Sequence, residues 1–268
     1  MTIRLEHNGG VVTLWLARPE RRNAFHGEML AAIDAALSEV QADASARVLV
    51  LAGEGVAFCA GADLGWMAAA ALEGDGANDR NARIMGGIFH RLSACTLPTI
   101  ARVHGAAMGG GVGLASACDF VVAGPGAFFA LSEVRLGLVP GVISPFVVRR
   151  LGAARARAAF LRGSKLDAAE AYRQGLADVY VEEADDAALD AAVAAITADL
   201  LRGGPEALAA CKRLADGVAG RDPADVLDFT AAMIAERRAS AEAQEGMAAF
   251  LGKRPAAWIP GADKGGAA

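Results

Sequence analysis

Cysteine motifs are missing from this sequence. The four cysteines, Cys59, Cys95, Cys118 and Cys211, lie far apart, and none forms a CxxC pair or the local Cys/His spacing of a zinc site. We therefore expect no metal centre. We interpret all four residues as buried free thiols in a reducing compartment, which favours a cytoplasmic protein.

Positive charge and long apolar runs are also scarce. The chain has 26 Lys and Arg against 31 Asp and Glu, a net charge of −5, and no Lys or Arg cluster of the kind that phosphate backbones need. The longest apolar stretches are too short and too rich in glycine to cross a bilayer. The first residues, Met1 to His7, resemble neither a signal peptide nor a presequence. We expect neither nucleic acid nor a membrane as a partner.

Several glycine motifs are absent although glycine is abundant. Four glycines fall within five positions, at 109, 110, 111 and 113, but a GxGxxG pattern that starts at Gly109 or Gly111 would end on Leu114 or Ser116. Neither GxxxxGK[ST] nor GxSxG occurs. The glycines therefore serve neither a dinucleotide fold, a phosphate loop nor a serine-hydrolase elbow, and something else requires bare backbone there.

Apolar periodicity indicates one main α/β domain in this chain of 268 residues, of which 54% are hydrophobic. Short apolar runs predict strands at 11–17, 48–52, 99–103, 120–123 and 178–181. Apolar residues at spacings of three and four predict helices at 28–41 and 81–94. Strands that alternate with helices favour a parallel sheet. Between the helices, the segment 72–79 predicts a mobile surface loop.

After residue 175 the pattern changes to alanine-rich helices, predicted at 185–201, 205–218 and 223–243. We expect a catalytic core over residues 1–200, a helical C-terminal subdomain used for assembly over 201–260, and a disordered tail over 261–268.

Three stretches carry the candidate chemistry. Residues 57–64 (AFCAGADL) and 104–114 (HGAAMGGGVGL) are small-residue turns between a strand and a helix, where a ligand could reach backbone amides. In residues 129–141 the acid Glu133 lies in a largely apolar segment. Amide groups can hold a developing oxyanion and a carboxylate can move a proton, which suits chemistry on a thioester without a metal or redox cofactor. By itself, Glu133 could equally form a surface ion pair with Arg135, and Asp63 is explained as the N-cap of the next helix.

Together these stretches resemble the crotonase (enoyl-CoA hydratase/isomerase) family. The resemblance covers about Ile3 to Trp258 and includes Arg18-Pro19 with Arg22-Asn23-Ala24, the segments 58–63 and 105–111, and Ser132-Glu133 to Pro140-Gly141. It implies an α/β spiral of ββα units with a C-terminal helical region that builds trimers, commonly paired as hexamers. The substrate would be an acyl-CoA thioester, so that coenzyme A is part of the substrate and no separate cofactor is needed.

The resemblance also implies roles for individual residues. The amides of Ala62 and Gly110 would form the oxyanion hole, and Glu133 would be the acid/base. Five residues would border the adenine and phosphate part of coenzyme A: Arg22, Ala24, Ala60, Asp63 and Leu64. Phe250 and Lys253 resemble residues that reach the coenzyme A of a neighbouring subunit.

One position departs from the family pattern. Family hydratases carry two glutamates, and here the first is replaced by Gly113, at the substrate site. Either Glu133 would then perform both proton steps of a hydration, or another group would substitute for the missing glutamate. Alternatively, the chain is a double-bond isomerase, or a homologue that binds acyl-CoA without turnover. The segments 61–67, 131–138 and 142–146 are similar to bacterial methylglutaconyl-CoA hydratases of leucine breakdown, which favours the single-glutamate hydratase. In that case Arg135 could meet a substrate carboxylate.

Overall fold

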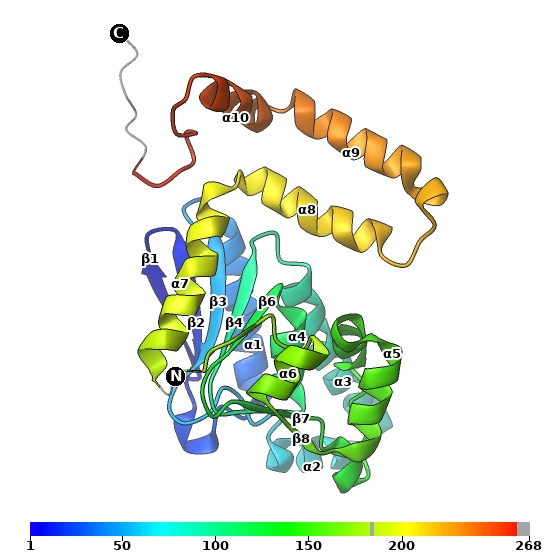
Figure 1. The fold of residues 1–268 in the computed structure, drawn as a ribbon. Helices are drawn as coiled ribbons and strands as arrows, with labels where there is room; N and C mark the ends of the chain where they lie inside the picture. Colours follow the sequence, from blue (N-terminus) through cyan, green and yellow to red (C-terminus); the bar gives the residue numbers. More distant parts are fainter. Residues whose placement is uncertain (183–184, 262–268) are drawn as a thin grey trace.

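The computed structural model describes residues 1–182 and 185–261, and its framework is a six-stranded sheet in the order β1-β2-β3-β4-β6-β9 (Figure 1). The strands are β1 (Ile3–Asn8), β2 (Val11–Leu16), β3 (Val48–Gly53), β4 (Thr99–Val103), β6 (Phe120–Ala123) and β9 (Val179–Tyr180). Only the β1–β2 pair is antiparallel. The parallel sheet and its predicted strands are confirmed.

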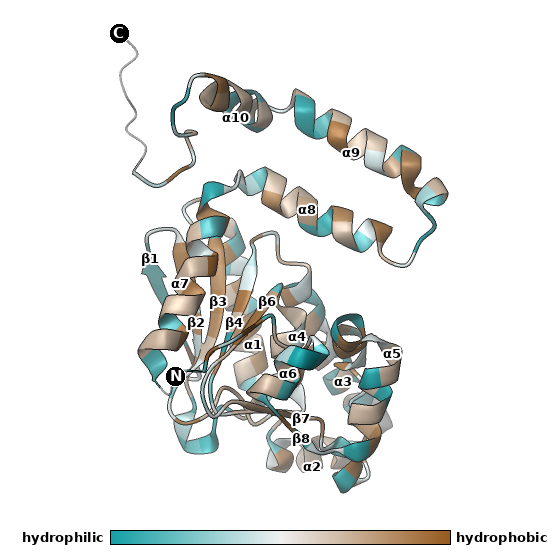
Figure 2. Cartoon of the chain, viewed as in Figure 1, coloured by the Kyte–Doolittle hydropathy of each residue, from teal (hydrophilic) through white to brown (hydrophobic). Residues whose placement is uncertain are grey.

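The sheet is buried on both faces. β3 and β4 are buried at every residue, and Figure 2 shows the apolar β3 inside the sheet and the polar strand β1 at its edge. The alternate residues Leu49 and Leu51 belong to a core cluster with α1 (Gly27–Ala42), α3 (Asp75–Ser93), α4 (Gly110–Ala117) and α5 (Ser144–Arg162). Val48 and Val50 pack instead with α7 (Asp186–Arg202). Coverage of both faces explains why the strands read as continuous apolar runs.

A small second sheet positions the glycine turn. It contains β5 (Ala106–Met108), β7 (Phe128–Ala130) and β8 (Lys165–Asp167), and Met108 pairs with Ala130 in the parallel register of β5 and β7. The residues that follow these two strands, Gly109 and Leu131, therefore leave the sheet side by side. The Gly109 N–H donates to the Ala130 carbonyl at 2.8 Å and holds them together.

The segment between the first helices differs from the prediction. α2 (Leu64–Leu72) and α3 are joined by Glu73 and Gly74 alone, so the predicted loop over 72–79 is wrong. Gly74 has φ +92°, which turns the chain within two residues, and its carbonyl accepts from the N–H groups of Ala77 and Asn78. Polar residues of this stretch, such as Asn78, lie on the exposed face of the first turns of α3.

The C-terminal helices form a layer beyond one end of the sheet (Figure 1). They are α8 (Pro205–Val218), α9 (Leu227–Ala239) and α10 (Ala241–Leu251), whereas α6 (Ala168–Gln174) stays with the core. The helix predicted at 223–243 is broken, because Ser240 has extended backbone and caps α10 through the Ala243 N–H. The tail predicted over 261–268 lies, apart from Gly261, outside the described residues. Within the described ranges, no helix has both the length and the apolar character of a membrane span.

Candidate active site

The two small-residue turns meet at one place. Residues 57–61 run beside β5, because the Cys59 N–H donates to the Ala106 carbonyl and the Met108 N–H donates to the Cys59 carbonyl. A Cβ at Gly61 would lie 2.7 Å from the Met108 carbonyl oxygen and 3.4 Å from the Gly110 nitrogen. Only glycine allows this approach, which brings the peptide of Gly61 and Ala62 against the start of α4.

Backbone conformation leaves two amides free for a ligand. Gly61 and Gly109 have φ of +90° and +49°, and each precedes one of the proposed oxyanion residues, Ala62 and Gly110. Among the described residues, neither the Ala62 N–H nor the Gly110 N–H donates a hydrogen bond to the protein. The Gly110 N–H is also the first of α4, where the helix dipole favours negative charge. These amides can therefore hold a developing oxyanion.

Glu133 lies next to this pair. It begins a short 3₁₀ helix (Glu133–Leu136), and its Oε1 lies 3.1 Å from the position that a Cβ on Gly109 would occupy. Its Oε2 is buried and has no hydrogen-bond partner in the part of the chain that the structure describes. Burial raises the pKa of the carboxyl above its ordinary value.

The alternative surface ion pair between Glu133 and Arg135 does not form. Neither residue takes part in any ion pair among the described side chains. Arg135 is exposed, and its side chain lies beside Gly163. A carboxylate oxygen that is buried without a partner is costly, and the presence of one here, on the half-buried Glu133, indicates a functional role.

A cavity of ≈ 490 Å³ joins these groups. Ala62, Gly109, Gly110 and Glu133 all line it. The rest of its wall is largely apolar and includes Phe25, Met67, Met85, Leu138, Val142 and Ile143. Within the described chain, Glu133 is the one ionisable side chain that lines it, and Asn78 and Ser132 are its other polar side chains.

The residues proposed for coenzyme A gather at one edge of the cavity. The Ala60 N–H donates to the Arg22 carbonyl at 2.9 Å, which places Arg22 and Ala24 beside the turn at 60–64. Ala60 and Leu64 line the cavity, whereas Arg22 is exposed outside it. The structure brings these residues together; their contacts with coenzyme A stay a prediction.

Asp63 caps α2 as predicted. Its Oδ1 accepts from the N–H groups of Gly65 and Trp66, and these bonds, the Trp66 bond first, lower the pKa of the carboxyl. Its Oδ2 lies 3.5 Å from the Arg18 guanidinium. The cap fixes the direction in which α2 leaves the oxyanion turn.

Sequence reasoning missed Asn23, which ties the site together. Its side chain is fully buried, accepts from the Arg18 N–H, and donates to the carbonyls of Glu54 and Ala57 at 2.9 and 2.8 Å. Its φ of +57° is rare for a residue with a side chain, although Asn tolerates it better than most. The one signal available in the sequence was therefore an Asn in a turn, between two basic residues and an alanine. Asn23 thus holds the turn at 18–25 against the turn at 54–61.

Cys59 serves a related purpose. Its buried thiol donates to the Asn23 carbonyl at 3.1 Å and accepts from the Gly61 N–H at 3.4 Å. Burial raises the pKa of this thiol to about 12, so it stays protonated and unreactive. The thiol links Asn23 to the residue that orients the Ala62 amide.

Gly113 is buried behind the cavity wall. A Cβ there would lie 2.2 Å from Ile143 Cγ2 and 3.2 Å from Phe89 Cε1, and it is Ile143 that lines the cavity. The space that a longer side chain would need at position 113 is filled by these two residues. No carboxylate therefore faces Glu133 from this position.

Phe250 and Lys253 lie at the end of α10 in the helical layer, and neither lines the cavity. The Phe250 side chain is 83% exposed, and Leu251 beside it is 80% exposed. Their contact with a neighbouring subunit stays a prediction.

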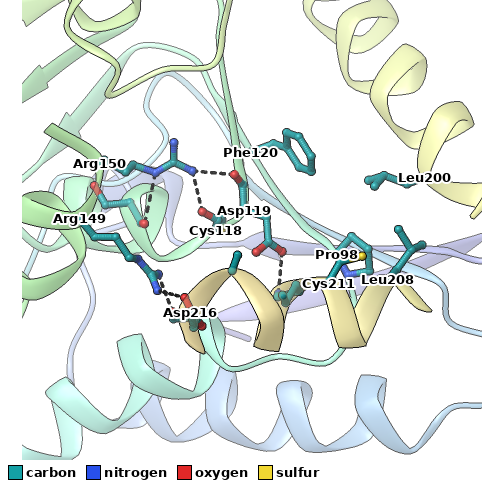
Figure 3. A pocket seen from close by; sticks show the side chains of 14 residues that line it. Pro98, Cys118, Asp119, Phe120, Arg149, Arg150, Leu200, Leu208, Cys211 and Asp216 are labelled. Atoms are coloured by element: carbon teal, nitrogen blue, oxygen red, sulfur yellow. Dashed lines mark hydrogen bonds and ion pairs between the residues drawn. The ribbon is translucent and has the colours of Figure 1, made fainter. Parts of the chain in front are cut away.

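A second cavity of ≈ 430 Å³ lies between the core and α8 (Figure 3). Its cations are neutralised, because Lys212 pairs with Asp119, Arg149 with Asp216, and Arg150 with Asp178. Cys211 lines it and is exposed, so the expectation of four buried thiols is wrong for this residue. Both acids that line it, Asp119 and Asp216, are ion-paired, unlike Glu133, and it is not the candidate active site.

The chain is similar to enoyl-CoA hydratases over nearly its whole length. Enoyl-CoA hydratase ACTT6 of Alternaria alternata is 36% identical over 252 residues, which covers 93% of this chain and 81% of that protein. A crystal structure of an enoyl-CoA hydratase from Shewanella pealeana matches with a TM-score of 0.92 and 35% identity, covering 96% of both chains. Pseudomonas aeruginosa AtuE matches with a TM-score of 0.91 and 38% identity, covering 97% of this chain and 100% of that one.

The model of the family described as enoyl-CoA hydratase/isomerase matches residues 6–260. This match confirms the resemblance to the crotonase family and the α/β fold class that it implies. With its paired amide turns, its lone carboxylate and the fold that holds them, this chain belongs to the enoyl-CoA hydratase/isomerase (crotonase) family.

Proposed function

We propose that this protein is an enoyl-CoA hydratase, a hydro-lyase that adds water to a 2-enoyl-CoA thioester with a single carboxylate. The observation that carries the proposal is the half-buried Glu133, whose buried Oε2 has no hydrogen-bond partner among the described residues, beside two free amides in one cavity. The names of the relatives support the same reaction.

In this mechanism the thioester carbonyl accepts hydrogen bonds from the amides of Ala62 and Gly110. Glu133 takes a proton from water as the water oxygen bonds to C3, and the electron pair of the C2–C3 double bond moves into an enolate held by the amides. The same carboxyl then returns its proton to C2. Oxyanion donors of this kind are worth about 10²–10³ in rate, and a positioned base about 10²–10⁴. We propose that no cofactor other than the coenzyme A of the substrate takes part.

A second candidate is double-bond isomerisation on the same site. Its support is Gly113, because a lone carboxylate that removes a proton and returns it elsewhere suffices for that reaction. Product mass separates the two: hydration adds one water, and isomerisation leaves the mass unchanged.

The experiment is a comparison of crotonyl-CoA, 3-methylglutaconyl-CoA and a 3-enoyl-CoA, with wild-type protein and Glu133→Gln. Addition of water that disappears in the variant supports the hydratase. A shifted double bond without a mass change supports the isomerase. Binding without turnover of any substrate would mean that the protein is a non-catalytic acyl-CoA binder, and full activity of Glu133→Gln would refute the mechanism.

For the acyl chain we propose 3-methylglutaconyl-CoA of leucine breakdown, and this proposal rests on sequence similarity alone. The cavity wall is largely apolar, and no Lys or Arg side chain of the described chain lines it. A distal carboxylate would then lie towards the exposed Asn78 and solvent, since Arg135 lies outside. A higher kcat/KM for 3-methylglutaconyl-CoA than for crotonyl-CoA would support this substrate.

We further propose a cytoplasmic homotrimer or homohexamer assembled through the C-terminal helices. Large apolar side chains are exposed on α9 and α10, where Leu227, Ile234, Phe250 and Leu251 are each more than half exposed. Exposed apolar side chains that form a contiguous patch mark interaction sites, and we propose that these residues form one. Light scattering on the purified protein measures the assembly, and a monomer would refute it.

A further inference from the structure

The proposed hydration leaves one requirement unassigned, the group that orients the attacking water. Glu133 can accept one O–H of that water, but a single contact does not fix the direction of the oxygen lone pair. Gly113 provides no second carboxylate, and Ile143 and Phe89 fill the space beside it. A second polar group of the cavity wall is therefore needed to hold the water, and the polar side chains that line the cavity are the candidates.

Two candidates line the cavity besides Glu133. Asn78 is exposed in the first turns of α3, at the solvent side. Ser132 is half-buried and directly precedes Glu133, and among the described residues its Oγ makes no hydrogen bond. Of these two residues, Ser132 is the one next to the base.

Backbone conformation lets both neighbours face the same cavity. Consecutive residues of an extended strand point to opposite sides. Ser132 instead has φ −91° and ψ 8°, so the chain leaves β7 and turns before Glu133, and both residues line the cavity. The bond from the Gly109 N–H to the Ala130 carbonyl holds this turn beside the Gly110 amide. Hydroxyl, carboxylate and oxyanion amide are thus placed by one pair of strands.

Resting on the hydratase function proposed above, we propose that Ser132 is a catalytic residue that orients the attacking water. Its Oγ accepts one O–H of the water while the Glu133 carboxylate accepts and removes the other proton. The C3–O bond forms, the O–H bond of water that faces Glu133 breaks as its proton passes to the carboxylate, and the C2–C3 electron pair becomes the enolate held by Ala62 and Gly110. Glu133 then returns this proton to C2. Ser132 stays neutral, and no proton is transferred to it.

The test uses Ser132→Ala with 2-hexenoyl-CoA, a substrate that can be either hydrated or isomerised, and both products are measured by chromatography and mass spectrometry. We expect kcat for hydration to fall about 10- to 100-fold with KM nearly unchanged, because the hydroxyl acts on the water rather than on the thioester. Isomerisation needs no water, so the fraction of 3-hexenoyl-CoA in the product should rise. Ser132→Thr, which keeps a hydroxyl, should restore hydration.

Ser144→Ala is the matched control. Ser144 donates to the Gly141 carbonyl near the cavity but does not line it, and its loss should leave the product ratio unchanged. An unchanged hydration rate and product ratio in Ser132→Ala would overturn the proposal. Equal loss of both products would overturn it too, by showing a merely structural effect. Absence of hydration in the wild-type protein would instead refute the proposed function itself.

Discussion

Replacing Gly113 by Ala tests the most crowded contact behind the site. The added methyl would lie 2.2 Å from Ile143 Cγ2, 2.8 Å from Ile143 Cβ and 3.2 Å from Phe89 Cε1, far inside the ~3.5–4 Å of a normal carbon contact. Ile143 is 3% exposed and Phe89 is fully buried, so neither side chain can move into solvent. Overpacking of this kind costs about 1–3 kcal/mol.

Helix propensity offsets part of that cost. Gly113 lies inside α4, where Ala is better than Gly by up to about 1 kcal/mol. The net loss should be about 1–2 kcal/mol, which lowers Tm by roughly 2–8 °C in a chain of this size. Thermal unfolding followed by circular dichroism measures it, with Gly87→Ala as control, because Gly87 lies in α3 with open space around it.

A double mutant identifies the contact responsible. Ile143→Ala alone should destabilise by about 2–5 kcal/mol through the cavity it leaves. In the pair Gly113→Ala with Ile143→Ala, the new methyl occupies part of that space, so the loss should be smaller than the sum of the singles by about 1–3 kcal/mol. An unchanged or higher Tm for Gly113→Ala, or additive losses in the double mutant, would refute this account of position 113.

Three further expectations follow from the site. Because burial raises the pKa of Glu133, the folded state loses stability as the pH rises from the ordinary Glu pKa through the raised one. Glu133→Gln should therefore raise Tm near neutral pH and not in acid, which pH-dependent melting measures. In the wild type, kcat/KM should fall on acidification at a pH above the ordinary Glu pKa. Asn23→Ala removes three buried hydrogen bonds and should cost about 2–4 kcal/mol in urea unfolding, and a loss below 1 kcal/mol would contradict its assigned role. A thiol reagent on the native protein should modify the exposed Cys211 first, and rapid labelling that survives Cys211→Ser would contradict the burial of Cys59 and Cys118.

Much of the sheet could be predicted from the sequence, because strands covered on both faces read as continuous apolar runs. β3 and β4 follow this rule, and the alanine-rich pattern predicts α8 with its observed bounds. The start of α3 was missed because its first turns are polar and contain Gly76, while the tertiary contacts that make them helical are invisible in local composition. The three-residue strands β5, β7 and β8 are likewise too short for a periodicity signal.

The site was predictable where backbone geometry forces a residue type. Gly61 and Gly109 need positive φ, and a lone acid in an apolar segment pointed to Glu133. Asn23 and Cys59 could not be found in this way, because their hydrogen bonds join segments about 30 residues apart. The filling of position 113 by Ile143 depends on the packing of α4 against the start of α5, which also has no local signature.

The central claim, that Glu133 activates water at a single-carboxylate site, is tested most directly with crotonyl-CoA in ¹⁸O-labelled water. We expect a product that carries one labelled oxygen at C3 with wild-type protein, and a rate lower by about 10²–10⁴ with Glu133→Gln. A wild-type product without label, or full-rate labelling by the Glu133→Gln variant, would contradict it.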